Sequence, residues 1–140
     1  MTAKMTAGEI TDFLDHVFPQ ARGLFRIEGI GAGSARVRMP ISEQHLRPGG
    51  TVSGPSMFWL ADCAFYVAVL ASIGPQAQAV TTNMNINFMR RPSLNDLVGE
   101  ARILKLGRRL AVGDVTLFSL GDDRPVAHAS VTYAIPDNKF

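Results

Sequence analysis

Asp62 has the clearest capacity for acid–base chemistry in this chain. It is the only charged side chain between Arg47 and Arg90, and it interrupts a long apolar segment, 54–73. A carboxylate among apolar side chains loses hydration and becomes a stronger base unless hydrogen bonds compensate. Perturbed carboxylates of this kind gather at functional sites. We therefore interpret Asp62 as a catalytic candidate.

The structural alternative for Asp62 is a buried carboxylate that neighbouring strand groups such as Thr81 or Asn83 satisfy. On a helix, the neighbours of a residue lie three and four positions away. For Asp62 these positions hold only aromatic residues, which would either line an apolar pocket or belong to the core. They are Phe58, Trp59, Phe65 and Tyr66.

The turn that enters this segment, 49–55, is the second chemical feature. Unpaired N–H groups at a helix N-terminus bind an anion or polarise a carbonyl, and Gly54 is placed to supply one. Ser53 is also expected to act as an ordinary N-cap, and the two roles can coexist. Gly54 and Asp62 are eight residues apart, which is about 12 Å on a helix at 1.5 Å per residue.

That spacing has a consequence for assembly. A base and an oxyanion donor must both lie about 3 Å from the reacting centre, so one helix cannot supply both to one site. If both residues act, each comes from a different subunit, which predicts a two-fold homodimer with two equivalent interface sites.

Apolar spacing and turn residues predict the elements that must position these groups. An amphipathic helix is expected over 7–18, with Thr6 and Glu9 forming a capping box. Two strands, 24–31 and 34–41, form a hairpin, and a loop covers 42–52. Further strands are expected at 78–89, 97–106, 110–119 and 125–135.

The central helix over 54–73 starts near Pro55 and ends at Gly74. Its apolar character all round requires burial on most sides. The plan is therefore α+β: one domain, 1–140, with a lead-in over 1–22 and a core over 23–136, in which an antiparallel sheet curls around one helix.

The strand 78–89 alternates between apolar and polar residues, which predicts two distinct faces. The asparagine face would belong to the subunit seam or lie in solvent. One face is predicted to carry Val80, Thr82, Met84, Ile86 and Phe88, and the other Thr81, Asn83, Asn85 and Asn87.

Composition excludes several functional classes. With 46% hydrophobic residues and a net charge of +2, the 140-residue chain can bury a core and is not disordered. Its Lys and Arg residues are scattered, so no nucleic-acid partner is expected. The single cysteine, Cys63, rules out a disulfide framework. The absence of a secretory leader favours the cytoplasm.

The sequence favours neither a membrane span nor a metal site. The segment 57–74 is at the lower limit for a membrane span, but no Lys or Arg flanks it, so a core helix is favoured and no membrane is expected. No metal is expected either, because His16, His45 and His128 share no ligand spacing with Cys63 or with one another.

Four stretches together resemble the hotdog-fold acyl-CoA thioesterases of the phenylacetate-pathway-like branch. His45, Gly50, Gly54 and Asp62 match family positions in order and spacing, and the resemblance covers roughly 25–135. The stretches are HLRPGGTVSGPSMFWLAD (45–62), VTTNMNINFMRRP (80–92), LGRRLAV (106–112) and VAHASVTYAI (126–135).

The resemblance implies a hotdog fold and hydrolysis of an acyl-CoA thioester to an acid and CoA. It implies that the Gly54 N–H polarises the carbonyl and that Asp62 of the partner subunit is general base or nucleophile, with Thr81 orienting Asp62 or water. CoA enters as part of the substrate, and no other cofactor is expected. The expected assembly is a homodimer or a pair of such dimers. Candidates for binding the CoA phosphates are Arg90, Arg91, Arg108 and Arg109.

Three positions depart from the family pattern: Arg47 replaces an asparagine, Ser53 a histidine and Pro55 a glycine. Pro55 has no N–H to donate, whereas Gly54 keeps its own. Ser53 would contact the thioester or water, and Arg47 an acyl carboxylate or a phosphate, or else lie in solvent. These changes leave open a protein that binds thioesters without hydrolysing them. A hotdog hydratase is disfavoured because it needs a loop histidine, and His45 is the only one.

Overall fold

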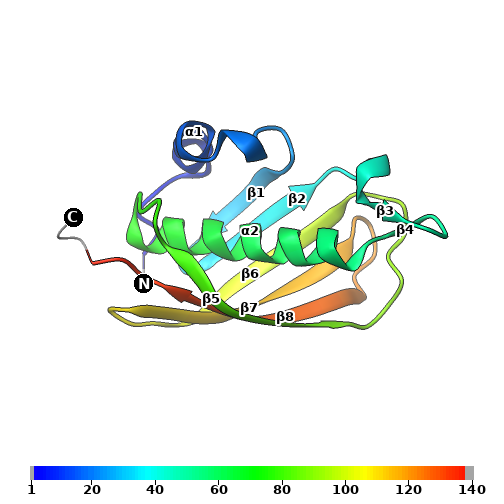
Figure 1. The fold of residues 1–140 in the computed structure, drawn as a ribbon. Helices are drawn as coiled ribbons and strands as arrows, with labels where there is room; N and C mark the ends of the chain where they lie inside the picture. The colour runs from blue at the N-terminus through cyan, green and yellow to red at the C-terminus, as the bar shows by residue number, and fades with distance from the viewer. Residues whose placement is uncertain (1, 138–140) are drawn as a thin grey trace.

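The computed structural model describes residues 2–137, in which one antiparallel sheet curls around one long helix (Figure 1). The α+β prediction is confirmed. The helices are α1 (Ala7–Val17) and α2 (Gly54–Ile73), with short 3₁₀ turns at Pro19–Ala21 and Glu43–His45. The strands are β1 (Arg26–Gly31), β2 (Ser34–Met39), β3 (Leu46–Arg47), β4 (Thr51–Val52), β5 (Val80–Phe88), β6 (Leu97–Leu106), β7 (Leu110–Ser119) and β8 (Pro125–Ala134).

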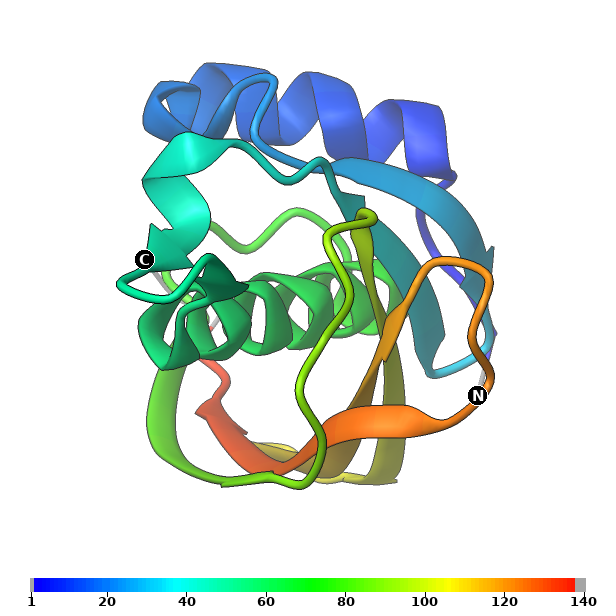
Figure 2. The same cartoon turned by 90° about the vertical axis from the view of Figure 1, so that its right-hand side faces the viewer.

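The main sheet has the order β1-β2-β6-β7-β8-β5. The predicted β1–β2 hairpin and the β6–β7–β8 meander are both present. The chain leaves β2, passes through α2, and returns in β5 at the far edge of the sheet, beside β8. Figure 2 shows the sheet folded around α2, with α1 covering the opposite side. As a result, β5 is an edge strand whose outer side has no partner within the described chain.

The sheet accommodates α2 because two strand glycines leave space for helix side chains. A Cβ at Gly99 would lie 3.2 Å from the Ala64 methyl, and one at Gly113 would lie 2.7 Å from Phe65 Cε1. Phe65 and most of the apolar side chains of α2 are fully buried. Although α2 is long and apolar enough to cross a membrane, 67% of its most apolar window is buried inside the protein.

Two local features differ from the predictions. The loop expected over 42–52 contains a 3₁₀ turn and the small β3–β4 hairpin, in which Gly49 and Gly50 adopt positive φ values of 97° and 74°. In β5, a bulge between Thr81 and Asn83 breaks the expected alternation. Because a bulge adds one unpaired residue, it changes which side chains face the helix.

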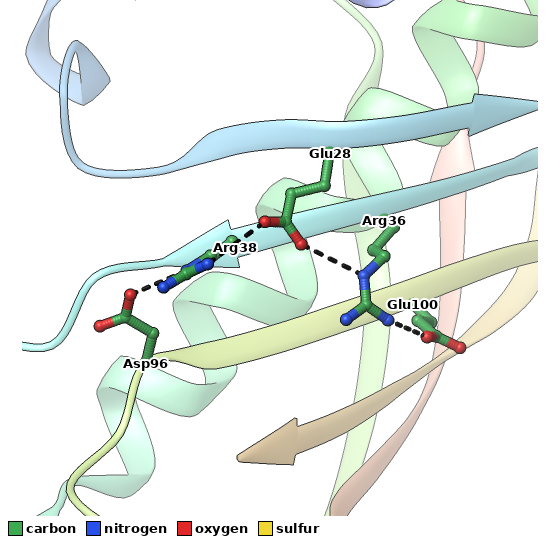
Figure 3. A network of polar contacts seen from close by, with 5 residues as sticks. All are labelled: Glu28, Arg36, Arg38, Asp96 and Glu100. Carbon is green, nitrogen blue, oxygen red and sulfur yellow. Dashed lines mark hydrogen bonds and ion pairs between the residues drawn. The ribbon is translucent and has the colours of Figure 1, made fainter. Parts of the chain in front are cut away.

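At the opposite edge of the sheet, an ion-pair network joins β1, β2 and β6 (Figure 3). Arg36 contacts Glu28 and Glu100, and Arg38 contacts Glu28 and Asp96. Burial acts to raise the pKa of Asp96, but hydrogen bonds from Arg38 and the Ile41 N–H outweigh it and hold the pKa below its ordinary value. Exposed pairs of this kind contribute about 0–1 kcal/mol each, so the network supports the sheet edge modestly.

Candidate functional site

Asp62 lies half-buried on α2, on the side that faces β5. Its Oδ1 accepts a hydrogen bond from the Thr81 hydroxyl at 2.5 Å and another from the Tyr133 hydroxyl at 2.8 Å. The Tyr133 oxygen also lies 3.1 Å from the Asp62 backbone carbonyl oxygen. Among the described residues, none donates a hydrogen bond to Oδ2. One carboxylate oxygen is therefore fixed and the other is available.

Thr81 reaches Asp62 because of the β5 bulge. Strict alternation predicts that Thr81 lies on the asparagine face of the strand, and this prediction is wrong. Thr81 faces α2, as do Met84 and Ile86 further along the strand. Asn83 lies exposed and makes no hydrogen bond to Asp62. Of the two strand groups considered as partners for Asp62, Thr81 is the one in contact.

Tyr133, on β8, was not among the predicted site residues. Its side chain is 3% exposed, and its ring packs against both Phe65 and Tyr66. Burial, followed by the neighbouring charge of Asp62, raises the pKa of Tyr133, so the phenol stays protonated and acts as a donor. The signal in the sequence is an inward position on an alternating strand, because a buried tyrosine hydroxyl needs a polar partner.

A surface hollow of about 380 Å³ opens beside Asp62. Five polar or aromatic side chains line it, and the other four lining residues are small or branched apolar residues. The lining residues are Val17, Phe18, Asp62, Tyr66, Ala77, Ala79, Val80, Thr81 and Tyr133. Asp62 is thus neither sealed in the core nor fully in solvent, which suits a carboxylate that meets a ligand.

The aromatic residues three and four positions from Asp62 do not form a continuous collar. Phe65 is fully buried in the core, Trp59 packs edge-on against Phe25 with ring centroids 5.7 Å apart, and Phe58 is 40% exposed. Tyr66 is the member that lines the hollow, and its hydroxyl donates to the Ala77 carbonyl at 3.0 Å. Burial raises the pKa of Tyr66.

The first turn of α2 leaves one backbone donor unused. The Ser53 hydroxyl oxygen accepts from the Ser56 N–H at 3.2 Å, which confirms Ser53 as the N-cap. Pro55 has no N–H. The Gly54 N–H has no acceptor among residues 2–137. A Cβ on Gly54 would lie 3.3 Å from the Phe88 ring, so the end of β5 covers this part of the helix.

The loop that precedes α2 holds His45 and Arg47. The His45 Nδ1 accepts from the Ser42 N–H at 2.9 Å, and its carbonyl accepts from the Ser53 N–H at 2.8 Å. These bonds anchor His45 within its own turn and tie that turn to the start of the helix. The Arg47 side chain is exposed on β3.

The four arginines considered for phosphate binding lie in two separate places. Arg90 and Arg91 follow β5 near the start of α2, where Arg91 donates to the Gly49 carbonyl at 3.1 Å. Arg108 and Arg109 form the β6–β7 turn, beside the other end of β5, because Leu110 and Val80 both pair with Ala134. The two ends of β5 are about 27 Å apart at 3.4 Å per residue.

Other reactive side chains give no second centre in the described part of the chain. Cys63 is buried, and burial, followed by the charge of Asp62, raises the pKa of its thiol, which disfavours the thiolate. The described residues contain no cluster of three or more His, Cys, Asp or Glu residues that could hold a metal ion.

Comparison with known proteins identifies the family of this chain. Residues 49–126 match the model of the thioesterase superfamily, and this match includes both Gly54 and Asp62. A Pseudomonas aeruginosa protein named provisionally as an esterase is 33% identical over 101 residues, which are 71% of this chain and 74% of that protein.

Solved structures agree with this match. A protein of Silicibacter sp. TM1040, described provisionally as a thioesterase, is 51% identical, with a TM-score of 0.90 over 98% of this chain and 96% of that chain. A mutant of the phenylacetic acid degradation protein of Thermus thermophilus is 25% identical, with a TM-score of 0.72 over 84% of this chain and 99% of that chain. The predicted family and fold are confirmed: the chain belongs to the thioesterase superfamily and has its hotdog fold.

Proposed function

We propose that this protein hydrolyses an acyl-CoA thioester to a carboxylic acid and CoA, at sites formed between two copies of the chain. Membership of the thioesterase superfamily supports thioester hydrolysis in general. The observation that carries the finer proposal is that two groups lack a hydrogen-bond partner among residues 2–137: the Gly54 N–H, a donor, and the Asp62 Oδ2, an acceptor.

The Gly54 N–H is the electrophilic half of the proposed site. It lies at the positive end of a twenty-residue helix, where the dipole favours negative charge on a bound oxygen. A thioester carbonyl that accepts this hydrogen bond becomes polarised, and the oxyanion formed on attack is stabilised. One such donor typically contributes about 3–4 kcal/mol to the transition state.

Asp62 is the nucleophilic half. As general base, its Oδ2 takes a proton from water while the water oxygen bonds to the thioester carbon. The tetrahedral intermediate then collapses, the C–S bond breaks, and the CoA thiolate leaves and takes up that proton. As nucleophile, Oδ2 bonds to the carbon itself, the thiolate leaves, and water hydrolyses the resulting anhydride. Both routes require Oδ2 to face the substrate.

The spacing along α2 supports a two-subunit site. Gly54 and Asp62 are about 12 Å apart on one helix, too far to act on one carbonyl. The edge strand β5 runs beside both residues, with Thr81 on Asp62 and Phe88 against Gly54. An antiparallel pairing of β5 with its copy across a two-fold axis would bring the Phe88 end of one subunit to the Val80 end of the other.

Exposure along β5 supports the same arrangement. Val80 and Phe88 at its two ends, and Met89 directly after it, are each more than half exposed, at 53%, 52% and 53%. An unpaired edge with apolar side chains is a template for another strand. This pairing would also bring Arg108 and Arg109 of one subunit toward Arg90 and Arg91 of the other, so that both pairs could serve one CoA.

A panel of acyl-CoA thioesters tests the proposal, with thiol release as the measurement. We expect turnover by the wild type and a loss of about 10²- to 10⁴-fold in Asp62→Asn, because the base or nucleophile is removed. Asp123→Asn, which removes an exposed carboxylate in the β7–β8 turn, is the control and should keep its activity.

The same panel distinguishes the alternatives. Tight binding of acyl-CoA without thiol release would contradict hydrolysis and favour the thioester-binding protein that Arg47, Ser53 and Pro55 leave open. Equal turnover by Asp62→Asn and the wild type would exclude Asp62 from the chemistry. A hydratase finds no support in the geometry of the loop, because the His45 Nδ1 is engaged within its own turn.

A further inference from the structure

The two carboxylate oxygens of Asp62 have different surroundings. Oδ1 accepts from two hydroxyls, Thr81 at 2.5 Å and Tyr133 at 2.8 Å, whereas Oδ2 has no donor among the described residues. Two donors on one oxygen fix the orientation of the carboxylate. They also leave the second oxygen as the one that can meet water or a carbonyl carbon.

Tyr133 differs from Thr81 in the way it holds Asp62. Its hydroxyl lies within hydrogen-bonding distance of both Oδ1 and the backbone carbonyl of the same residue, at 2.8 and 3.1 Å. One rigid phenol therefore holds the Asp62 carboxylate in a fixed position relative to the Asp62 backbone and restricts rotation of the Asp62 side chain. The ring is itself held between Phe65, at a centroid distance of 5.3 Å, and Tyr66, at 6.0 Å.

The surroundings of Asp62 contain few other titratable groups. On α2, Cys63 is buried beside it, and Tyr66 stacks on Tyr133 but donates to Ala77. Of the described residues that line the hollow, Asp62 alone is charged. The other elements there contribute Val17 and Phe18 after α1, Ala77 and Ala79 before β5, Val80 and Thr81 on β5, and Tyr133 on β8.

We propose that Tyr133 is a positioning residue for the hydrolytic carboxylate: it fixes Oδ1 and so selects Oδ2 as the reacting oxygen. This inference rests on the proposed function. Tyr133 is 3% exposed and its hydroxyl is engaged by Asp62, so its role is to hold Asp62 in place. Burial raises the pKa of the phenol, which keeps the donor protonated across the working pH range.

Tyr133→Phe tests the inference because it removes the hydroxyl and keeps the ring. We expect kcat to fall about tenfold or more while the KM for an acyl-CoA changes less than about twofold, since substrate binding is not touched. The acidic limb of the kcat/KM profile should move to higher pH, because the variant loses a hydrogen bond to the reacting carboxylate.

Tyr66→Phe is the matched control. It removes a hydroxyl from the adjacent, stacked ring, but that hydroxyl bonds to Ala77 and not to Asp62. Even where this variant changes substrate binding, the acidic limb of its kcat/KM profile should lie at the same pH as in the wild type. If Tyr66→Phe moves the limb as far as Tyr133→Phe, the specific role of Tyr133 is excluded.

A second substitution keeps the test decisive if Tyr133→Phe fails to fold. Replacement of Tyr133 by 3-fluorotyrosine keeps the ring and hydroxyl but strengthens the donor, and it should move the acidic limb to lower pH. An unmoved limb would overturn the inference. Failure of this inference can be told apart from failure of the proposed function. If only the inference fails, Asp62→Asn is inactive while the Tyr133 variants behave as wild type. If the proposed function fails, Asp62→Asn is itself active.

Discussion

The two ends of the candidate site are built in different ways. At the start of α2 the chemistry belongs to the backbone: Ser53 caps the Ser56 N–H, Pro55 has no N–H, and the Gly54 N–H has no acceptor among residues 2–137. Two turns further along, the chemistry belongs to the Asp62 side chain, which two hydroxyls from β5 and β8 hold in place.

This difference determines which substitutions of neighbouring residues each end of the site tolerates. A backbone donor depends on the helix and its cap, so the side chains around it can vary, as Arg47, Ser53 and Pro55 do relative to the family pattern. A side-chain carboxylate depends on neighbours at fixed positions, because Thr81 and Tyr133 must arrive from two different strands. Under the proposed function, each end would supply one half of a hydrolytic site that is shared between two chains.

Apart from Asp62→Asn, removal of the backbone donor should have the largest effect on turnover. Gly54→Pro deletes the N–H at the first helical position, which accepts proline, and the extended Ser53 backbone (φ −74°, ψ 152°) suits a residue before proline. We expect kcat for acyl-CoA hydrolysis to fall about 10²- to 10³-fold.

Gly54→Ala is the control for that change. It adds a similar Cβ contact with the Phe88 ring but keeps the N–H. Steady-state kinetics should show a much smaller loss of kcat for alanine than for proline. Equal losses would mean that crowding against Phe88, and not the missing donor, explains the effect.

The arginines beside the two ends of β5 should have a smaller effect. We expect the double variant Arg108→Ala/Arg109→Ala to raise the KM for an acyl-CoA roughly five- to tenfold, since exposed charge pairs contribute about 1 kcal/mol or less each. The kcat should not change.

An acyl-pantetheine thioester without the nucleotide phosphates is the matched substrate for this test. Its KM should be the same for wild type and the double variant. A parallel rise in both KM values would show that these arginines do not act through phosphate.

Local sequence signals predicted the elements of the fold well. Pro55 near the start and Gly74 after the end define α2 at 54–73, the limits the structure has. Thr6 and Glu9 form the predicted capping box. These signals succeed because each depends on residues within a few positions of one another.

The partners of Asp62 could be predicted only in part, because they depend on strand register. Thr81 was named, but strict alternation put it on the wrong face of β5, since the bulge between Thr81 and Asn83 has no local marker in the sequence. Tyr133 lies 71 residues from Asp62 and meets it only because β8 pairs with β5 at the sheet edge. Sheet order is decided by tertiary packing, which helix and strand periodicity do not encode.

The most direct test of the shared site is complementation between two inactive chains. Asp62→Asn retains Gly54, and Gly54→Pro retains Asp62, so a mixed dimer would contain one intact site and one doubly defective site. Random reassociation of equal amounts should restore about a quarter of the wild-type thiol release, because half the dimers are mixed and each has one of two sites. No recovery, in a mixture shown by mass spectrometry to contain mixed dimers, would contradict the account.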